Sequence, residues 1–548
     1  MHTEIIGAGD LAGKPGRARP AIWLAPLTTA TLALAWRGLL LALEAFPFNA
    51  DEAVVGLMAR HILAGERPTF FYGQAYMGSL DAGLVALGFA VFGQHVLVIR
   101  AVQVLLYSAT VLTAVLLACR VTRRHTAAWA SGLILAIPPL NVTLYSTVSL
   151  GGYGEALLIG NLLTLVALVI TERPDALWPF GVWGLLAGLG WWAFGLTLVY
   201  SLPSGALLVW VLLKRLPRRL AVARAVMAAG AALVGASPWL GWATVNGLRP
   251  LLSELAGSAI AGASPPSLLA AAGDHLLNLL VLGSTVILGL RPPWEVRWLA
   301  LPLLPLAMAF WLAVLVHLGG LVRQRAIPTG LKLLLASGAT LLLGFVLTPF
   351  GADPSGRYFV PLATPMAVLA GDLLTALADR WTRRLAMGLL FGLIAFHAWG
   401  TLDSALRPPG LTTQFDANTR IDHAFDAQLI AFLEGAGETR GYTTYWVAYP
   451  LAFLSDERLV YVPRLPYHPD LRYTPRDDRY PPYDEMVATS PRVAFITARH
   501  PVLDGILRQG LARLGVEWEE VAIGDYRVFY RLSRPVRPQE LGLGGKDE

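Results

Sequence analysis

Apolar stretches of about 20 residues recur along most of this 548-residue chain, separated by short basic clusters. Stretches of that length span a hydrocarbon core of roughly 30 Å as α-helices. Charged residues make up only 15% of the sequence, whereas ordinary soluble domains contain about 25%. The pattern therefore predicts an α-helical polytopic membrane protein and disfavours a water-soluble globule.

The basic clusters predict the orientation of the chain, because loops rich in Lys and Arg tend to remain in the cytoplasm. Residues 1–22 are expected to form a cytoplasmic tail, followed by a retained first helix, since no clear small-residue cleavage site is present. Alternating the clusters across the bilayer predicts about 11 spans within residues 23–402. The expected helices are 23–43, 96–119, 126–140, 155–171, 177–194, 196–213, 222–244, 298–321, 331–348, 358–378 and 385–402.

Two apolar segments, 80–92 and 276–290, have the length of interfacial or re-entrant helices rather than of spans. Counting the first as a span would place the basic cluster that begins at Arg120 outside the cell. Residues 45–97 are therefore expected to form one long outer loop with two surface helices. The segment 276–290 is likewise expected to stay outside.

From residue 403 onward the composition changes to that of soluble proteins, with strand-like runs between helical stretches. Residues 403–548 are therefore predicted to form an extracytoplasmic α/β domain. The Pro/Tyr/Arg-rich segment between Pro463 and Tyr483 is predicted to be a long loop, either functional or merely mobile. The strand-like runs are 441–446, 459–462, 493–497 and 526–532, and 501–514 is helical.

Several functional classes lack support in the sequence. The net charge of +6 arises from clusters between apolar segments, so it indicates topology rather than nucleic-acid binding. A single cysteine, Cys119, excludes an intramolecular disulfide and a thiolate metal cluster. No nucleotide-binding, zinc-protease or nucleophile-elbow motif is present. No cofactor is firmly predicted, and a divalent metal would have to be held by carboxylates such as Asp51 and Glu52.

Adjacent carboxylates, Asp51 and Glu52, follow directly after the first predicted helix. At a membrane surface such a pair costs solvation free energy unless it is hydrated, paired or used in function. The alternative interpretation is structural: Asp51 caps the surface helix that follows, and Glu52 lies in its first turn. The residues alone leave both interpretations open.

Two further short motifs lie at predicted outer helix ends: Ile99-Arg100-Ala-Val, and Gly356-Arg357-Tyr358-Phe-Val-Pro361. Together with the acidic pair, these motifs resemble those of the GT-C superfamily of integral-membrane glycosyltransferases in their order and in the side of the membrane on which they are predicted to lie. The resemblance covers most of residues 24–402. The resemblance is to the branch of protein O-mannosyltransferases and lipid A aminoarabinose transferases.

The resemblance implies a role for each of these motifs. Asp51 corresponds to the catalytic base, with Glu52 as its partner, and Arg100 with Arg357 and Tyr358 would bind the donor phosphate. Sugar transfer from a lipid phosphate needs a carboxylate to accept the acceptor proton and cations to hold the departing phosphate. With one acidic pair in the loop and no second nucleophile evident, a single displacement with inversion of configuration is expected.

The resemblance fails at one motif, where many members carry a Lys-Pro-Pro-type element and this chain has Tyr76-Met-Gly-Ser-Leu-Asp81. A lysine contact to the donor phosphate is thus missing or replaced. Arg37 in the first helix is a further candidate for the phosphate site, with snorkelling to the interface as its alternative. The expected substrate pocket comprises Tyr72, Gln74, Tyr76, Asp81, Tyr153 and Glu155. Tyr153 and Glu155 follow a glycine turn that could shape the pocket. The alternative interpretation is that this segment is only a turn and the start of a helix.

The resemblance as a whole implies a glycosyltransferase of the inner (plasma) membrane. It would move a sugar from a polyprenyl-phosphate donor to an unknown lipid, glycan or protein acceptor on the outer face. Membrane lipids are its expected surroundings, with no nucleic-acid partner. The alternative is a polytopic transporter or flippase of lipid-linked sugars, although no internal repeat or pair of broken helices indicates one. A receptor or scaffold would leave about ten spans unexplained.

Overall fold

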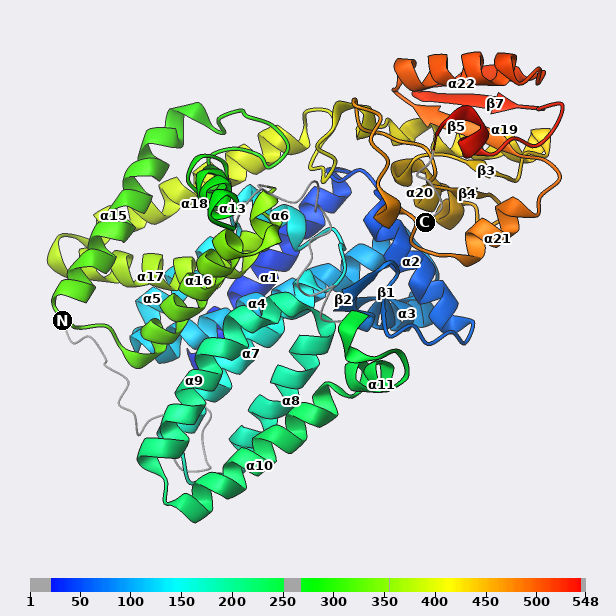
Figure 1. Ribbon diagram of the computed structural model, residues 1–548. Coiled ribbons are helices and arrows are strands. Elements are labelled where there is room, and N and C mark those ends of the chain that lie inside the picture. Colours follow the sequence, from blue (N-terminus) through cyan, green and yellow to red (C-terminus); the bar gives the residue numbers. More distant parts are fainter. Residues whose placement is uncertain (1–20, 251–267, 354, 544–548) are drawn as a thin grey trace.

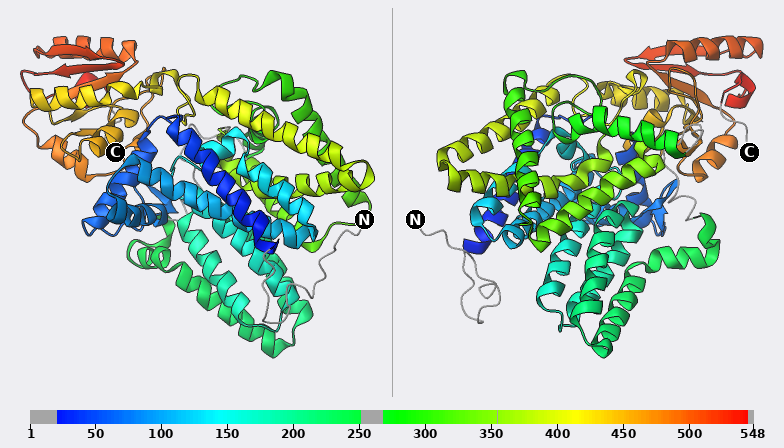
Figure 2. Two further views of the ribbon diagram at one scale, coloured as in Figure 1. Left: turned by 180° about the vertical axis from the view of Figure 1, so that it is seen from behind. Right: turned by 60° about the vertical axis from the view of Figure 1, so that its left-hand side comes forward.

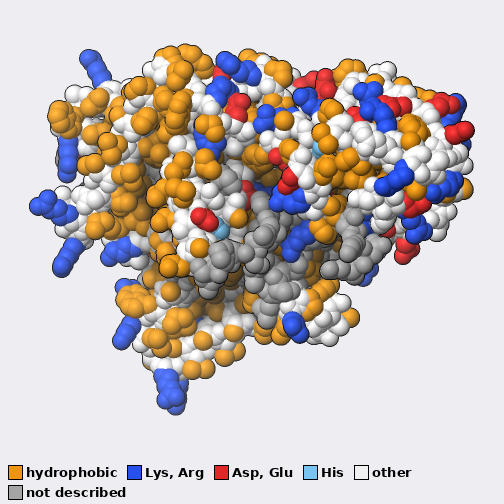
Figure 3. Space-filling view, turned by 45° about the horizontal axis from the view of Figure 1, so that its top comes forward, with side chains coloured by type: hydrophobic (Ala, Val, Ile, Leu, Met, Phe, Trp, Pro, Cys, Tyr) orange, Lys and Arg blue, Asp and Glu red, His pale blue; other side chains and the backbone are white. Residues whose placement is uncertain are grey.

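The computed structural model describes residues 21–250, 268–353 and 355–543, and these are mainly helical. Most of the predicted cytoplasmic tail lies outside the described residues. A helical part occupies one side of the molecule, and a smaller α/β domain sits at one end of it (Figures 1 and 2). Apolar side chains dominate the visible surface of the helical part, whereas charged side chains of both signs cover the α/β domain (Figure 3).

Nine helices among the described residues are long and apolar enough to cross a membrane, or up to ten if the bent pair α10–α11 counts as one span. The sequence predicted about 11. The helices of this part are α1 (Ala21–Ala42), α4 (Val96–Thr122), α5 (His125–Ala136), α6 (Leu140–Tyr145), α7 (Tyr153–Glu172), α8 (Trp178–Ala193), α9 (Leu198–Arg215), α10 (Arg218–Gly235), α11 (Ser237–Asn246), α13 (Leu268–Leu277), α14 (Ser284–Ile287), α15 (Leu304–Arg323), α16 (Thr329–Leu347), α17 (Ala363–Arg380) and α18 (Arg383–Ala405).

Prolines explain much of the difference in the number of spans. Helix α5 ends at Ala136, because Pro138 and Pro139 follow and a residue before proline is disfavoured in a helix. The predicted helix 222–244 breaks between α10 and α11 with a bend of 67°. Pro238 lies at the start of α11, where it fits the first helical turn but cannot continue the hydrogen bonds of α10.

The predicted re-entrant segment 276–290 is longer than expected, because the helical stretch covers Leu269–Ile287. Its length alone would allow it to cross the bilayer. Its contacts lie near the C-terminal end of α16: His275 Nδ1 is 3.0 Å from the carbonyl oxygen of Val346, and Asn278 donates to the carbonyl oxygen of Gly351 at 3.1 Å.

The segment between α1 and α4 contains the two expected helices, α2 (Ala50–Leu63) and α3 (Leu80–Phe92). They are joined by an antiparallel pair of short strands, β1 (Phe70–Phe71) and β2 (Gln74–Gly78), which the sequence analysis did not predict. The hairpin brings Gln74 and Tyr76 to the C-terminal domain, and so it contributes to the site described below.

The C-terminal domain is an α/β domain with a five-stranded sheet of order β4-β3-β5-β7-β6. Its first three strands are parallel, and β7 pairs antiparallel with both β5 and β6. The predicted strand 441–446 is shorter in the structure and ends at Tyr442, because a helix begins at Tyr445. Strand β6 was not predicted. The elements are α19 (Asp426–Ala436), β3 (Arg440–Tyr442), α20 (Tyr445–Leu454), β4 (Val460–Val462), α21 (Pro482–Ala488), β5 (Ala494–Ala498), α22 (Pro501–Arg513), β6 (Glu519–Ile523) and β7 (Tyr526–Tyr530).

Helix α20 packs against α2 and thereby fixes the C-terminal domain to the helical part (Figure 1). The ring of Phe453 lies 5.7 Å from that of Phe48 and 6.2 Å from that of Phe89, measured between centroids. Gly56 leaves room for this ring, since a Cβ atom there would lie 2.6 Å from Phe453. The two parts therefore share a continuous apolar interface.

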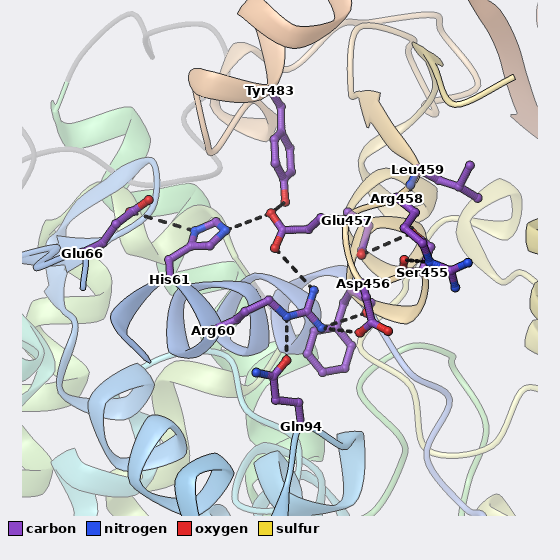
Figure 4. Close-up of polar contacts among 12 residues, drawn as sticks. Arg60, His61, Glu66, Gln94, Ser455, Asp456, Glu457, Arg458, Leu459 and Tyr483 are labelled. Carbon is purple, nitrogen blue, oxygen red and sulfur yellow. Dashed lines mark hydrogen bonds and ion pairs between the residues drawn. The ribbon is translucent and has the colours of Figure 1, made fainter. Parts of the chain in front are cut away.

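A polar cluster borders this interface, with Glu457 at its centre (Figure 4). His61 Nε2 lies 2.9 Å from Glu457 Oε1, and Tyr483 donates to the same oxygen at 2.7 Å. Arg60 pairs with the other carboxylate oxygen at 3.4 Å and with Asp456 at 3.1 Å. Although burial opposes ionisation, the contacts with His61, Tyr483 and Arg60 lower the pKa of Glu457 to about 2.

Replacing Glu457 by Gln should lower the free energy of unfolding by about 1–3 kcal/mol at neutral pH, because Arg60 and His61 lose a carboxylate partner. The carboxylate stabilises the folded state fully above its ordinary pKa of 4.5. This contribution is lost as the pH falls from there toward 2, since only the folded state keeps the group ionised in that window. Thermal unfolding of wild type and variant across this range measures the difference, which should shrink with falling pH.

The matched control is Glu519→Gln, which removes an exposed carboxylate paired with Arg531 at 2.9 Å. Exposed ion pairs contribute little to stability, so the melting temperature should hardly change. Equal losses in the two variants, or an unchanged melting temperature in Glu457→Gln, would contradict the role given to the cluster.

Candidate active site

A cavity of about 280 Å³ lies where the helical part, the β1–β2 hairpin and the C-terminal domain meet. All three regions contribute side chains to its wall. They are Asp51, Gln74, Tyr76 and Met77 from the segment between α1 and α4; Tyr145, Leu150, Tyr153, Asp353 and Arg357 from the rest of the helical part; and Thr413, Phe415, Asp416, Thr419, Tyr445, Trp446, Tyr467, His468, Asp477 and Arg479 from the chain after α18.

Asp51 lies in the first turn of α2 and faces the cavity. The helix is capped by Asn49, whose Oδ1 accepts from the backbone N–H of Glu52 at 3.0 Å, so the capping role considered for Asp51 belongs to Asn49. Tyr445 of α20 donates its hydroxyl to Asp51 Oδ1 at 2.6 Å. Burial and the nearby Asp51 raise the pKa of Tyr445 well above its ordinary value, which keeps this hydroxyl a donor.

Glu52 points away from the cavity into the protein and is fully buried. Its two carboxylate oxygens accept from Nε and Nη2 of Arg100, each at 2.9 Å. Arg100 also donates to the carbonyl oxygen of Pro47 at 3.3 Å and does not line the cavity. The geometry therefore does not support the expected phosphate contact of Arg100, because its guanidinium lies outside the cavity wall.

Arg357 does line the cavity, as expected of a phosphate-binding residue. Its Nε pairs with Asp353 Oδ2 at 2.6 Å, and its guanidinium carbon lies 5.0 Å from the centre of the Tyr358 ring. Tyr358 is buried and supports Arg357 from outside the cavity wall.

Arg37 is buried within the helical part and does not reach an interface, so neither snorkelling nor a position at the cavity is observed. It donates to Ser146 Oγ at 2.8 Å, and its guanidinium carbon lies 3.6 Å from the centre of the Tyr107 ring. These contacts join α1 to α6 and α4.

The six expected pocket residues separate into two groups. Gln74, Tyr76 and Tyr153 line the cavity, whereas Tyr72, Asp81 and Glu155 do not. Tyr72 lies in the polar cluster between the domains, where it donates to Glu66 at 2.9 Å and stacks on Tyr480.

Asp81 and Glu155 are buried together behind the cavity wall. Asp81 accepts hydrogen bonds from Gln103 Nε2 at 2.7 Å and from the Ser149 hydroxyl. Burial raises the pKa of Asp81. The contact with Ser149 ties this cluster to the turn that carries Leu150 and Tyr153, which line the cavity.

The residues that the C-terminal domain contributes, chiefly Tyr445, Asp477 and Arg479, were not predicted from the sequence. The signal for two of them was the Pro/Tyr/Arg-rich segment after Pro463, which was predicted to be a loop that is either functional or mobile. That loop forms part of the cavity wall. Burial raises the pKa of Asp477 to about 7, with the charge of Arg479 opposing the shift.

A metal site has little support in the described part of the chain. Among these residues, no group of three or more His, Cys, Asp or Glu side chains is arranged to hold an ion. Glu52 is engaged with Arg100, so the two carboxylates that would have to hold a divalent ion, Asp51 and Glu52, do not converge on one point. The cavity is therefore interpreted through its carboxylates and arginines.

No protein-family model matches the chain, and no curated protein matches it in sequence. Solved structures do resemble it. ArnT from Cupriavidus metallidurans, bound to undecaprenyl phosphate, is 15% identical with a TM-score of 0.55, over 92% of this chain and 98% of ArnT. The oligosaccharyltransferase of Archaeoglobus fulgidus, in complex with Zn and sulfate, is 14% identical with a TM-score of 0.51, over 86% of this chain and 67% of that one.

A third similar structure is the mycobacterial arabinofuranosyltransferase AftD, 11% identical with a TM-score of 0.51, over 94% of this chain and 42% of AftD. All three are GT-C glycosyltransferases. The chain therefore has the GT-C fold, as the resemblance in its sequence implied.

Proposed function

We propose that this protein is a membrane glycosyltransferase that moves a sugar from a polyprenyl-phosphate donor to an acceptor bound in the cavity. The observation that carries the proposal is Asp51, a carboxylate held by Tyr445 at the cavity wall that also contains Arg357. The GT-C fold supports it. So do two neighbours that bind a lipid phosphate: ArnT with undecaprenyl phosphate, and the archaeal oligosaccharyltransferase AglB with a dolichol-phosphate.

In the proposed reaction, an acceptor hydroxyl attacks the anomeric carbon of the donor sugar and Asp51 takes its proton. The bond between the anomeric carbon and the phosphate oxygen breaks, and its electron pair leaves with polyprenyl phosphate. Arg357 stabilises the negative charge of the departing phosphate. Tyr445 fixes the carboxylate of Asp51 so that its second oxygen remains available to the acceptor.

The acceptor is a lipid, a glycan or a protein on the outer face of the inner (plasma) membrane. Mass spectrometry of the glycolipids and glycoproteins of a deletion strain identifies it as the species that loses its sugar. The same strain complemented with single variants then supplies the assay for the predictions below.

Topology gives the first test, because the basic clusters predict an N-terminus in the cytoplasm and a C-terminal domain outside. Alkaline phosphatase fused to the C-terminus should be active, since this enzyme matures only outside the cytoplasm. A green fluorescent protein fused there should stay dark when exported through the same route. The opposite pair of signals would place the cavity on the cytoplasmic side and contradict the proposal.

Asp51→Asn tests the base, since asparagine has nearly the same shape but cannot accept the proton. Turnover should fall by about 10²-fold or more while donor binding is kept, because general-base catalysis is typically worth 10²–10⁴-fold. The assay is product formation in detergent, where transport across a bilayer cannot be measured. A transporter would therefore form no product in this assay. Near-normal turnover would remove Asp51 from this role.

The neighbouring Glu52→Gln is the matched comparison, because the same chemical change is made one residue away on a side chain that faces the interior. Glu52→Gln should lower the stability of the protein, because Arg100 loses its carboxylate partner. The rate of sugar transfer by the properly folded enzyme should not change. A Glu52→Gln enzyme that is stable yet inactive would contradict the division of roles between the two carboxylates.

Inversion of the anomeric configuration is expected, because Asp51 acts as a base and the reaction is a single displacement. NMR of the product gives the configuration directly. Retention would indicate a double displacement through a carboxylate beneath the anomeric carbon. In that case Asp477 is the first residue to replace, since it is a further carboxyl group in the same wall.

A further inference from the structure

Arg479 stands out among the arginines of the cavity by its surroundings. Its guanidinium carbon lies 5.3 Å from the centre of the Tyr445 ring and 6.0 Å from that of Phe71. One orientation of the Gln74 carboxamide satisfies both of its polar atoms. In this orientation the oxygen accepts from Arg479, whose Nη2 lies 2.8 Å away, and the nitrogen donates to the hydroxyl of Tyr76. Only 7% of the residue is exposed, so the cation is almost wholly removed from bulk water.

The other buried arginines of the region have carboxylate partners. Arg357 pairs with Asp353, and Arg100 pairs with Glu52. For Arg479, no carboxylate lies within ion-pair distance in the portion of the chain that the structure describes, and its Nε has no hydrogen-bond partner there. The charges of Asp51 and Asp477 act on Arg479 from beyond that distance. A buried cation without a direct ion-pair partner is unfavourable, so a site of this kind is suited to an anion.

The chain around Arg479 holds its side chain in this position. Its backbone N–H donates to the hydroxyl of Tyr449 at 2.6 Å, which ties the loop to α20. Gly73 turns the β1–β2 hairpin with a φ of +70°, and a Cβ atom there would lie 2.8 Å from Arg479 Cδ. The hairpin therefore leaves a space that the arginine side chain fills, between the two domains.

We propose that Arg479 binds the phosphate group of the polyprenyl-phosphate donor, so that the C-terminal domain supplies part of the donor site. The inference rests on the proposed function and adds a residue to it. A planar guanidinium presents parallel N–H donors that match two phosphate oxygens. Arg357 and Arg479 come from different domains and line one cavity, so both cations face the space in which the phosphate would bind.

The experiment uses the full-length protein purified in detergent, with undecaprenyl phosphate as the probe and undecaprenol as its phosphate-free control. Arg479→Gln should weaken binding of the phosphate about tenfold or more, as expected for the loss of a charge-assisted contact worth at least one tenfold step. Binding of undecaprenol should not change. Arg508→Gln removes an arginine that pairs with Glu520 on α22 and serves as the matched control, with wild-type affinity expected.

A second variant tests the same claim while keeping the arginine. Gln74→Glu puts a carboxylate beside Arg479, and this internal partner should compete with the phosphate and weaken binding in the same way. It should also keep the fold, because the buried cation gains a counter-charge. If Arg479→Gln lowers the melting temperature too far to be measured, Gln74→Glu decides the question.

The outcomes separate this inference from the proposed function. If wild type prefers undecaprenyl phosphate to undecaprenol and Arg357→Gln weakens binding, but Arg479→Gln and Gln74→Glu do not, the inference is overturned and the proposed donor stands. If wild type does not distinguish the phosphate from the alcohol, the proposed donor class itself is wrong.

Discussion

The packing of α20 against α2 is the constraint on which the site depends. Successive residues of an α-helix point about 100° apart, so the first turn of α2 directs Glu52 into the protein and Asp51 to the cavity. Arg100 forms an ion pair with Glu52, and Tyr445 of α20 donates a hydrogen bond to Asp51. If α20 left α2, Asp51 would lose its hydrogen bond and the cavity would lose one wall. The α/β domain is therefore part of the site and not an appendage of the membrane helices.

The charges of the cavity follow from the same junction. The helical part supplies Arg357 together with its own carboxylate, Asp353, so this cation is compensated before any substrate enters. The C-terminal loop supplies Arg479, which contacts aromatic rings and an amide directly, while the charges of Asp51 and Asp477 act on it from farther away. A donor phosphate would be recognised by one cation from each side, while the sugar and the acceptor lie near Asp51.

Much of the fold was predictable, because local sequence patterns indicate the individual helices. Hydropathy gave the helices, and α3 was predicted with its observed bounds. The position of Asp51 followed from the motif after the first helix. The partners of the site were not predictable, because Tyr445 lies 394 residues from Asp51 and no local pattern links them. The ion pair of Arg100 with Glu52 was not predictable for the same reason, because its motif indicates the helix end and not its partner.

We propose that a lipid phosphate binds between the two domains, next to Asp51. A cryo-electron microscopy structure of the full chain with a polyprenyl phosphate tests it most directly. The phosphate should contact Arg357 and Arg479, with its lipid leaving the cavity toward the bilayer and Asp51 still hydrogen-bonded to Tyr445. A phosphate bound outside this cavity, or held by Arg37 or Arg100, would contradict it.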